Sequence, residues 1–283
     1  MSRRSAFLDA LNEPGPLHAV ELRPPRSGLD PSRSLDAWIE SHHGLKRLLD
    51  QGRYVLYTDD AVGDREEESL RLLTTSLGPT ADLSKVLPFL TLKHPLEYCL
   101  LFARRAASYG LGAVTVTGGD VEVGPPRCLP RSRDLRALIR QGTPELPLGT
   151  WVNPYRDPEE QVGFLVGQEA HADYFLTQIV SHHGLDRVEG FLEAASARGL
   201  SLPGLFGVFY YRSGTPETLR RLARFFPVPV DELLAEFEAG VPPEEVCART
   251  IKGLRSRGVE KIYVCNLGER RPADVLRSIE ERL

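Results

Sequence analysis

Glu21 is the first residue whose type and position could support catalysis. It lies near the end of the apolar run Leu17–Leu22 and precedes a rigid turn that contains two prolines, Arg23-Pro24-Pro25-Arg26. A carboxyl that such a turn holds above an apolar strand is poorly solvated, which raises its pKa and lets it act as a general acid. The other interpretation of Glu21 is an ion pair with Arg23 or Arg26.

Asp120 is a second carboxylate of interest. It comes after Gly118 and Gly119, and because glycine has no side chain, a flat ligand could lie close to the backbone there. The alternative is a loop carboxylate that caps a turn.

Other polar residues also follow apolar runs. Lys93 and His94 could bind the phosphate of a cofactor, although a surface loop explains them equally well. The remaining residues of this kind are Thr58, Asp59, Thr91, Asn153, Thr177, Gln178, Tyr210, Tyr211, Arg212, Ser213 and Asn266.

The apolar runs themselves predict buried parallel strands. Most are continuous rather than alternating, as strands covered on both faces require. The predicted strands are Leu17–Leu22, Tyr54–Asp59, Val86–Leu92, Ala113–Gly119, Leu148–Asn153, Tyr174–Val180, Leu205–Tyr211 and Lys261–Asn266.

Helical patterns separate the strands, and several have proline at or near the first turn. The predicted helices are Leu35–Leu49, Glu66–Leu77, Pro95–Tyr109, Arg133–Arg140, Pro158–Gly167, Leu185–Arg198, Pro216–Phe225 and Pro243–Arg257.

Eight strand–helix units without a linker predict one (β/α)8 TIM barrel, a single domain over residues 1–283. Pro229–Ala239 is an extra helix between the seventh and eighth strands, and Pro272–Leu283 closes the chain. In such a barrel the site lies at the carboxyl ends of the strands, where the polar residues stand. An open doubly wound sheet is the alternative, but no glycine-rich phosphate loop follows the first strand.

Adjacent histidines occur at His42-His43 and at His182-His183. Neighbouring side chains on a helix or strand point apart, so one metal ion would not bind both members of a pair. We therefore expect no metal site. Tyr54, Tyr57 and Tyr263 are predicted to pack in the barrel wall.

The charge balance disfavours nucleic acid and membrane partners. The chain has 35 Lys and Arg against 39 Asp and Glu, a net charge of −4, and so lacks the positive field that would attract either. A local run of basic residues is predicted to form the solvent-exposed face of a helix, and anion binding is the alternative. This run consists of Arg127, Arg131, Arg133, Arg136 and Arg140.

The four cysteines form no CxxC pair, and the first residues fail as a signal peptide. No apolar run approaches the length of a membrane span. We expect a reduced, cytoplasmic protein, and the sequence leaves open whether it forms a homo-oligomer.

Several motifs, in chain order, resemble those of the methylenetetrahydrofolate reductases. That family opens its barrel with Phe-Glu-Phe-Phe-Pro-Pro-Arg/Lys, where this chain has Val20-Glu21-Leu22-Arg23-Pro24-Pro25-Arg26. Its fourth strand ends in Arg-Gly-Asp, where Gly118-Gly119-Asp120 stands here. Its sixth strand is matched by Ala170-His171-Ala172-Asp173 with Thr177-Gln178, and its seventh by Phe206 to Ser213. The resemblance extends over residues 17–270.

The resemblance implies an oxidoreductase of one-carbon and methionine metabolism that reduces 5,10-methylenetetrahydrofolate to 5-methyltetrahydrofolate. It assigns Glu21 as the general acid that opens the folate ring, Asp120 as the charge that stabilises the cation beside the pterin, and Gln178 as a residue that orients it. Gly119, Tyr210 and Tyr211 are expected to contact the folate substrate.

This chain departs from the family where the flavin phosphates bind. Apolar residues or glycine replace the family's donors at Leu56, Phe89, Gly118, Gly163 and Gly167. A dinucleotide's phosphates need donors or positive charge. We therefore expect no bound FAD, with NAD(P)H as the co-substrate that gives its hydride directly to the iminium.

Thr58, Thr91 and Phe209 remain as expected cofactor contacts, and Phe209, Tyr210 or Tyr211 would supply any stacking. One alternative is an ordinary FAD-dependent reductase with replaced contacts. Another is a folate-binding subunit without catalysis, which the retained Glu21 and Asp120 disfavour. The sequence does not distinguish NADH from NADPH.

Overall fold

The computed structural model describes residues 5–25, 28–59, 81–120 and 124–283, together with residues 70, 73, 77 and 122. The predicted helix Glu66–Leu77 falls outside the described residues except at three positions. Arg26, one of the two expected ion-pair partners of Glu21, also lies outside them.

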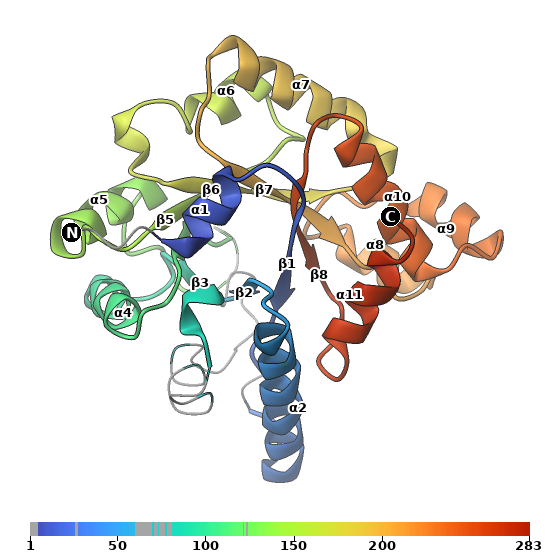
Figure 1. Cartoon of the computed structure of the whole chain (residues 1–283), viewed down its shortest axis with the longest axis horizontal. Coiled ribbons are helices and arrows are strands. Elements are labelled where there is room, and N and C mark those ends of the chain that lie inside the picture. Colours follow the sequence, from blue (N-terminus) through green and yellow to red (C-terminus); the bar gives the residue numbers. More distant parts are fainter. Residues whose placement is uncertain are drawn as a thin grey trace.

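The strands form a closed barrel in which each strand pairs in parallel with the next and β8 pairs with β1 (Figure 1). The (β/α)8 prediction is therefore confirmed. The strands are β1 Leu17–Leu22, β2 Val55–Tyr57, β3 Val86–Thr91, β4 Val114–Thr117, β5 Leu148–Val152, β6 Tyr174–Val180, β7 Gly204–Phe209 and β8 Lys261–Cys265.

Helices surround this ring of strands (Figure 1). Asp30 and Asp157 cap two of them by accepting a backbone N–H, and proline follows each cap at the first helical position. The α-helices are α1 Ala6–Asn12, α2 Pro31–Asp50, α4 Leu96–Ser108, α5 Ser132–Gly142, α6 Pro158–Gly163, α7 Leu185–Ala197, α8 Pro216–Leu222, α9 Val230–Glu238, α10 Pro243–Arg255 and α11 Pro272–Glu280. The 3₁₀ turns are η2 Leu83–Lys85, η3 Gln168–Ala170 and η4 His182–Gly184. The predicted extra helix is α9.

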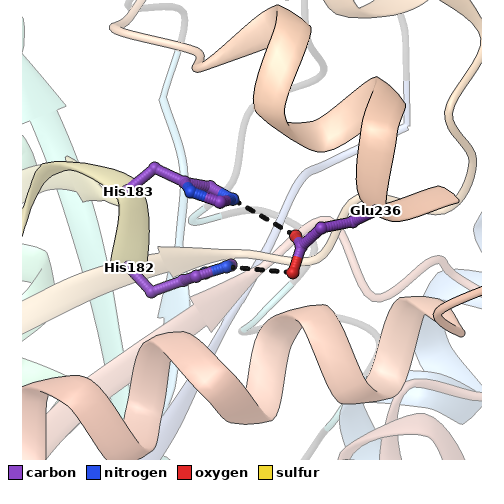
Figure 2. Close-up of side chains that lie close together, drawn as sticks. All are labelled: His182, His183 and Glu236. Atoms are coloured by element: carbon purple, nitrogen blue, oxygen red, sulfur yellow. Dashed lines mark hydrogen bonds and ion pairs between the residues drawn. The ribbon is translucent and has the colours of Figure 1, made fainter. Parts of the chain in front are cut away.

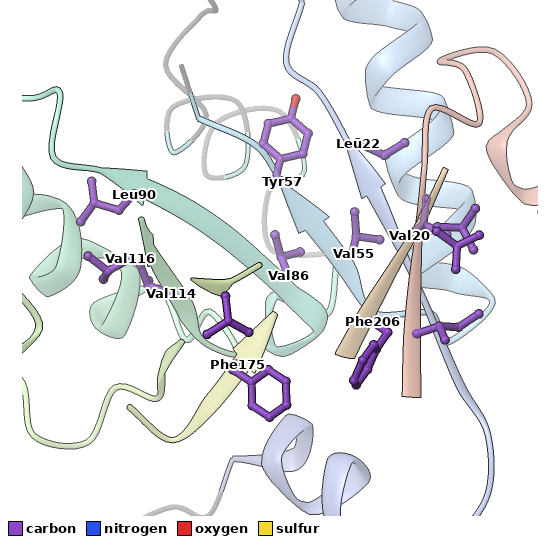
Figure 3. Close-up of a cluster of buried hydrophobic side chains, with 14 of the residues drawn as sticks. Val20, Leu22, Val55, Tyr57, Val86, Leu90, Val114, Val116, Phe175 and Phe206 are labelled. Carbon is purple, nitrogen blue, oxygen red and sulfur yellow. The ribbon is translucent and has the colours of Figure 1, made fainter. Parts of the chain in front are cut away.

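The strand residues divide between two hydrophobic clusters because successive side chains point to opposite faces. One cluster lies between the strands and the helices and includes Val20, Val55 and Val116 (Figure 3). The other, here called the interior cluster, fills the barrel; it contains Phe7, Leu11, Ala19, Leu56, Leu87, Ala113, Tyr174, Leu176, Ile179, Leu205, Tyr263 and Cys265.

Two tyrosines of the interior cluster connect strands that are not neighbours. Tyr174 on β6 is hydrogen-bonded to the Thr115 hydroxyl on β4 at 2.7 Å, and Tyr263 on β8 donates to the Thr177 carbonyl on β6 at 2.5 Å. Tyr57 and Tyr263 are buried, as the predicted packing role requires, and Tyr54 packs against the interior cluster.

The prediction that the run of arginines forms a solvent-exposed helix face is wrong for Arg136. Its side chain is 2% exposed, and its Nε donates to the Ala170 carbonyl at 2.8 Å. Burial lowers the pKa of Arg136 to about 10, so the group stays charged at neutral pH. Arg140 binds Asp173 at 2.5 Å and two backbone carbonyls. These two arginines fasten α5 to the chain around β5 and β6.

Helix α1 is absent from the sequence prediction. Its Phe7 is fully buried in the interior cluster, with its ring centroid 5.0 Å from that of Tyr174 in an edge-to-face contact. Lys261, the first residue of β8, donates to the carbonyls of Ala10 and Glu13. The helix therefore closes the barrel at the amino ends of the strands, opposite the expected site.

We expect Phe7→Ala to lower the free energy of unfolding by about 3–5 kcal/mol, because it removes a fully buried ring from the floor of the barrel. Urea unfolding followed by circular dichroism measures this loss. The matched control is Phe225→Ala, whose ring is 52% exposed and whose removal should change stability by less than about 0.5 kcal/mol. Equal losses in the two variants would show that α1 does not support the barrel.

Candidate functional site at the carboxyl ends of the strands

Glu21 lies at the mouth of the barrel and on its interior side. It stands two residues after Ala19 of the interior cluster, so its side chain points the same way, and it is level with Leu56 on β2 and Cys265 on β8. Burial, and next the charge of Glu21, raise the pKa of the Tyr263 phenol and of the Cys265 thiol well above their usual values. The charge of the Glu21 carboxylate therefore helps to keep the Tyr263 phenol and the Cys265 thiol protonated.

Two buried hydroxyls face the same mouth from β3 and β4. Thr91 and Thr117 are paired in register, and each lies two residues beyond an interior-facing residue, Phe89 and Thr115. Neither hydroxyl has a hydrogen-bond partner among the described residues. Buried hydroxyls of this kind usually bind water or a ligand.

Asp59 organises the rim between β2 and β3. One of its oxygens accepts the backbone N–H of Thr91 at 2.8 Å, and both lie 2.9 Å from His94 Nε2. The His94 ring lies against that of Tyr98, with centroids 4.6 Å apart. His94 is thus held by the protein, and Thr58, the expected contact at the end of β2, stands beside this group and is partly exposed.

Gly118 and Gly119 make room for two cationic side chains rather than for a flat ligand. A β-carbon on Gly118 would lie 2.9 Å from Arg127 Cζ, and one on Gly119 would lie 2.9 Å from Lys93 Cγ. Arg127 donates to the Gly119 carbonyl at 2.6 Å, and Lys93, only 7% exposed, donates to the Pro125 carbonyl at 3.0 Å. The two glycines therefore bring a pair of positive charges beside β4, and contact between Gly119 and a ligand stays a prediction.

Asp120 is exposed, and its Oδ1 accepts the backbone N–H of Glu122 at 2.8 Å. This contact is the turn cap that the sequence offered as the alternative. It occupies one carboxylate oxygen and fixes the side chain at the rim after β4.

Gln178 lies where the register of β6 against β7 shifts. Its side-chain oxygen accepts the Ile179 backbone N–H at 2.9 Å, which points the amide back along its own strand. The residue is partly exposed.

The two tyrosines expected to contact substrate are buried, at 7% for Tyr210 and 4% for Tyr211. Tyr210 donates to Glu244 on α10 at 2.6 Å, and burial, together with this bond, raises its pKa. Tyr211 packs with Leu219 on α8 and Leu233 on α9. These positions do not favour stacking on a ligand, whereas Phe209 is partly exposed on the interior side.

Trp151 is an aromatic residue at the mouth that the sequence analysis did not select. It lies two residues after Gly149, whose position is covered by the interior ring of Tyr174, so it faces inward on β5. Its side chain is 37% exposed. A tryptophan near the carboxyl end of the predicted strand Leu148–Asn153 was the signal in the sequence that could have identified it.

His182 and His183 do not point apart, so the reason for expecting no metal there is wrong. Their ring centroids are 3.9 Å apart, and both rings turn toward Glu236 on α9 (Figure 2). His182 Nε2 lies 3.2 Å from Glu236 Oε1, and His183 Nε2 lies 3.3 Å from Oε2. The three side chains form a group whose ligand atoms all lie within 4.8 Å of one another.

The electrostatics of this group depend on burial and on Arg249. Burial, then the neighbouring His183, lower the pKa of His182 despite Glu236. Burial alone would raise the pKa of Glu236, but the hydrogen bond from Arg249 at 2.6 Å and the two imidazoles lower it.

No family model matches the chain, and no curated protein matches it. Solved structures with the same fold do. An uncharacterized protein from Clostridium thermocellum that binds two copies of 5-methyl-5,6,7,8-tetrahydrofolic acid superposes with a TM-score of 0.68 at 14% identity, covering 98% of each chain.

Two further structures are more distant. An F420-dependent secondary alcohol dehydrogenase, in complex with an F420-acetone adduct, has a TM-score of 0.57 at 13% identity and covers 95% of this chain and 99% of its own. A protein from Aquifex aeolicus VF5 has a TM-score of 0.53 at 13% identity over 100% and 99%. At these identities the comparisons establish the barrel fold.

None of the helices in the described ranges has the length and apolar character that a membrane crossing needs.

Thr91→Val and Thr115→Val test whether the mouth hydroxyls are kept for a ligand. We expect Thr91→Val to change the free energy of unfolding by less than about 0.5 kcal/mol, because its hydroxyl has no partner among the described residues. Thr115→Val should cost about 1–3 kcal/mol, since it leaves the Tyr174 hydroxyl unbonded. Chemical unfolding compares the two isosteric changes; a large loss for Thr91→Val would show that this hydroxyl serves the fold.

Proposed function

We propose that this protein reduces 5,10-methylenetetrahydrofolate to 5-methyltetrahydrofolate with a hydride taken directly from NAD(P)H, without FAD. The observation that carries the proposal is the inward-facing Glu21 carboxyl at the end of β1, next to the phenol of Tyr263. A proton donor at this position suits ring opening, because it stands at the edge of a largely apolar interior where a proton has few other acceptors.

The reaction balances with one proton and one hydride. Glu21 gives a proton to N10 as the bond from N10 to the methylene carbon breaks, leaving an iminium at N5. The nicotinamide then transfers its hydride to the methylene carbon, which becomes the methyl group, and the nicotinamide is oxidised. Glu21 regains its proton from solvent. Asp120, on the rim, would stabilise the cationic iminium by its charge.

The rim of β3 and β4 suits the nucleotide. Thr91 and Thr117 offer hydroxyls that have no partner among the described residues, and the buried Nε of Arg127 is also unbonded within that part of the chain. Lys93 adds a second positive charge next to Arg127. Hydroxyls and cations of this kind bind the phosphates of NAD(P)H. Thr58, which follows β2, adds a further hydroxyl on this side of the rim.

The aromatic residues on the opposite side suit flat rings. Trp151 on β5 is exposed at the mouth and Phe209 on β7 is partly exposed. Either could stack on the pterin or the nicotinamide. Gln178 on β6 lies between them in strand order, and its amide nitrogen could donate to the folate ring.

The residues present do not fit FAD as the reductase family holds it. Leu56 is fully buried in the interior cluster and Phe89 packs against that cluster, so neither offers a donor to a phosphate. Arg127 lies against Gly118, which stands where the family has its arginine, but it comes from a loop rather than from β4 and so does not reproduce the family's contact.

The structural comparisons support a folate ligand and redox chemistry on this fold. One structure with this fold binds a methylated tetrahydrofolate, which has the form of the proposed product, and another is an F420-dependent alcohol dehydrogenase. The folate-bound structure equally favours a second candidate, a folate-binding protein without catalysis. Turnover measurements distinguish the two.

We expect the purified protein to be colourless and to remain so after incubation with excess FAD and removal of free flavin, because Leu56 and Phe89 supply no phosphate donors. The visible absorption spectrum measures this directly. NAD(P)H should be oxidised with methylenetetrahydrofolate but not with a quinone, whose reduction would require a flavin. A stoichiometric flavin spectrum would establish the FAD-dependent alternative instead.

Glu21→Gln should lower turnover by roughly 10²–10⁴-fold while folate binding is kept, because glutamine keeps the size of the side chain but cannot supply the proton. Binding is measured by quenching of Trp151 fluorescence in a Trp38→Phe background, which leaves a single tryptophan. Asp120→Asn should weaken both folate binding and turnover, since it removes a charge.

Glu97→Gln is the matched control, because this carboxylate is exposed in the first turn of α4 and has no part in the proposed chemistry. Thermal melting of each variant shows whether the barrel is intact. Turnover of Glu21→Gln close to that of Glu97→Gln would remove Glu21 from the mechanism, and folate binding without any turnover of the parent protein would favour the binding protein.

A further inference from the structure

Three side chains that commonly ligate metals converge outside the mouth of the barrel. His182 and His183 lie on η4, directly after β6, and Glu236 lies on α9, between β7 and β8 (Figure 2). We propose that this cluster binds a divalent transition-metal ion of the zinc type through the two imidazole Nε2 atoms and one oxygen of the carboxylate.

The spacing of the ligand atoms suits a tetrahedral ion. Zinc at ~2.0–2.1 Å from its ligands holds them about 3.3–3.4 Å from one another. Here His182 Nε2 and His183 Nε2 lie 3.2 Å and 3.3 Å from the two carboxylate oxygens, and all ligand atoms fall within 4.8 Å. Small rotations of the side chains are enough to complete the sphere.

The hydrogen bonds of His182 set the nitrogen that faces the carboxylate. The backbone N–H of His182 donates to the Thr250 hydroxyl at 3.2 Å, and His182 Nδ1 lies 3.0 Å from the same hydroxyl. This contact holds Nδ1 at Thr250 and turns Nε2 toward Glu236 Oε1, 3.2 Å away. Nε2 is therefore the nitrogen through which His182 would bind an ion.

The surrounding contacts resemble the outer shell of a metal site. Metal-bound imidazoles usually hydrogen-bond a protein oxygen through their other ring nitrogen, and Thr250 provides an oxygen at that place, 3.0 Å from His182 Nδ1. Arg249 donates to Glu236 Oε1 at 2.6 Å, which orients the carboxylate and leaves Oε2 facing His183.

The ligand set selects the class of ion. Imidazole nitrogen favours zinc and its neighbours over magnesium and calcium, which prefer oxygen. The side chain of His183 is 22% exposed, so water can reach the remaining coordination position. The ion would join η4 to α9.

A metal ion that joins η4 to α9 would hold α9 against the loop that follows β7. Phe237, next to Glu236, covers Gly214 on the loop after β7, and Leu233 on α9 packs against Tyr211. Metal binding should therefore stabilise this side of the barrel without contacting the proposed reacting atoms.

Zinc titration of the full-length protein after chelator treatment tests the proposal, with a chromophoric chelator as competitor. We expect equimolar binding, a higher melting temperature with zinc, and a tetrahedral visible spectrum with Co²⁺. His183→Ala and Glu236→Gln should abolish competitive binding, and Thr250→Val, which touches no ligand atom, should weaken it about 10–100-fold.

His42→Ala/His43→Ala is the matched control, because this adjacent pair on α2 has rings 5.5 Å apart and should be replaceable without loss of zinc. Circular dichroism of the metal-free variants shows whether each is folded. No zinc binding by the parent protein, or equal binding after His182→Ala/His183→Ala, would overturn the proposal.

Discussion

Closure of the parallel sheet is the constraint on which the rest of this structure depends. β1 pairs with both β2 and β8, which brings the first and last strands together and leaves no unpaired edge. Because every strand runs the same way, all carboxyl ends lie on one rim. Glu21, Thr91 and Trp151 are far apart in sequence, yet closure gathers them around one interior.

The fold was largely predictable because it rests on patterns that repeat. Buried strands, crossover helices and first-turn prolines each give a local signal, and the predicted bounds of β1 and β6 agree with the structure. Helix α1 gives no such signal. It is a short segment in which only Phe7 and Leu11 are buried, and its role comes from tertiary contact with Tyr174 rather than from periodicity.

The site was predictable where it depends on position along a strand and unpredictable where it depends on loops. The inward direction of Glu21 follows from alternation along β1. The positions of Arg127 above Gly118 and of Lys93 above Gly119 do not, because irregular segments set them. His182 and His183 turn the same way because one carboxylate offers an oxygen to each, and that partner is 53 residues distant from His183 in the chain.

The order of strands around the rim divides the mouth into two chemically different halves. β2 to β4 carry hydroxyls and have the cations Lys93 and Arg127 beside them, whereas β5 and β7 carry the exposed ring of Trp151 and the partly exposed ring of Phe209. β1 lies between β8 and β2, so Glu21 stands at one junction of these halves. Two bound ligands with anionic groups at one end and flat, reactive rings at the other would place the anionic groups on the half with Lys93 and Arg127. Their rings would lie on the half with Trp151 and Phe209, and the Glu21 carboxyl would lie at the boundary. That division gives the rim a direction, which a uniformly polar mouth would lack. Strand order and alternation set the places of the hydroxyls and the aromatic rings, and irregular segments add the two cations.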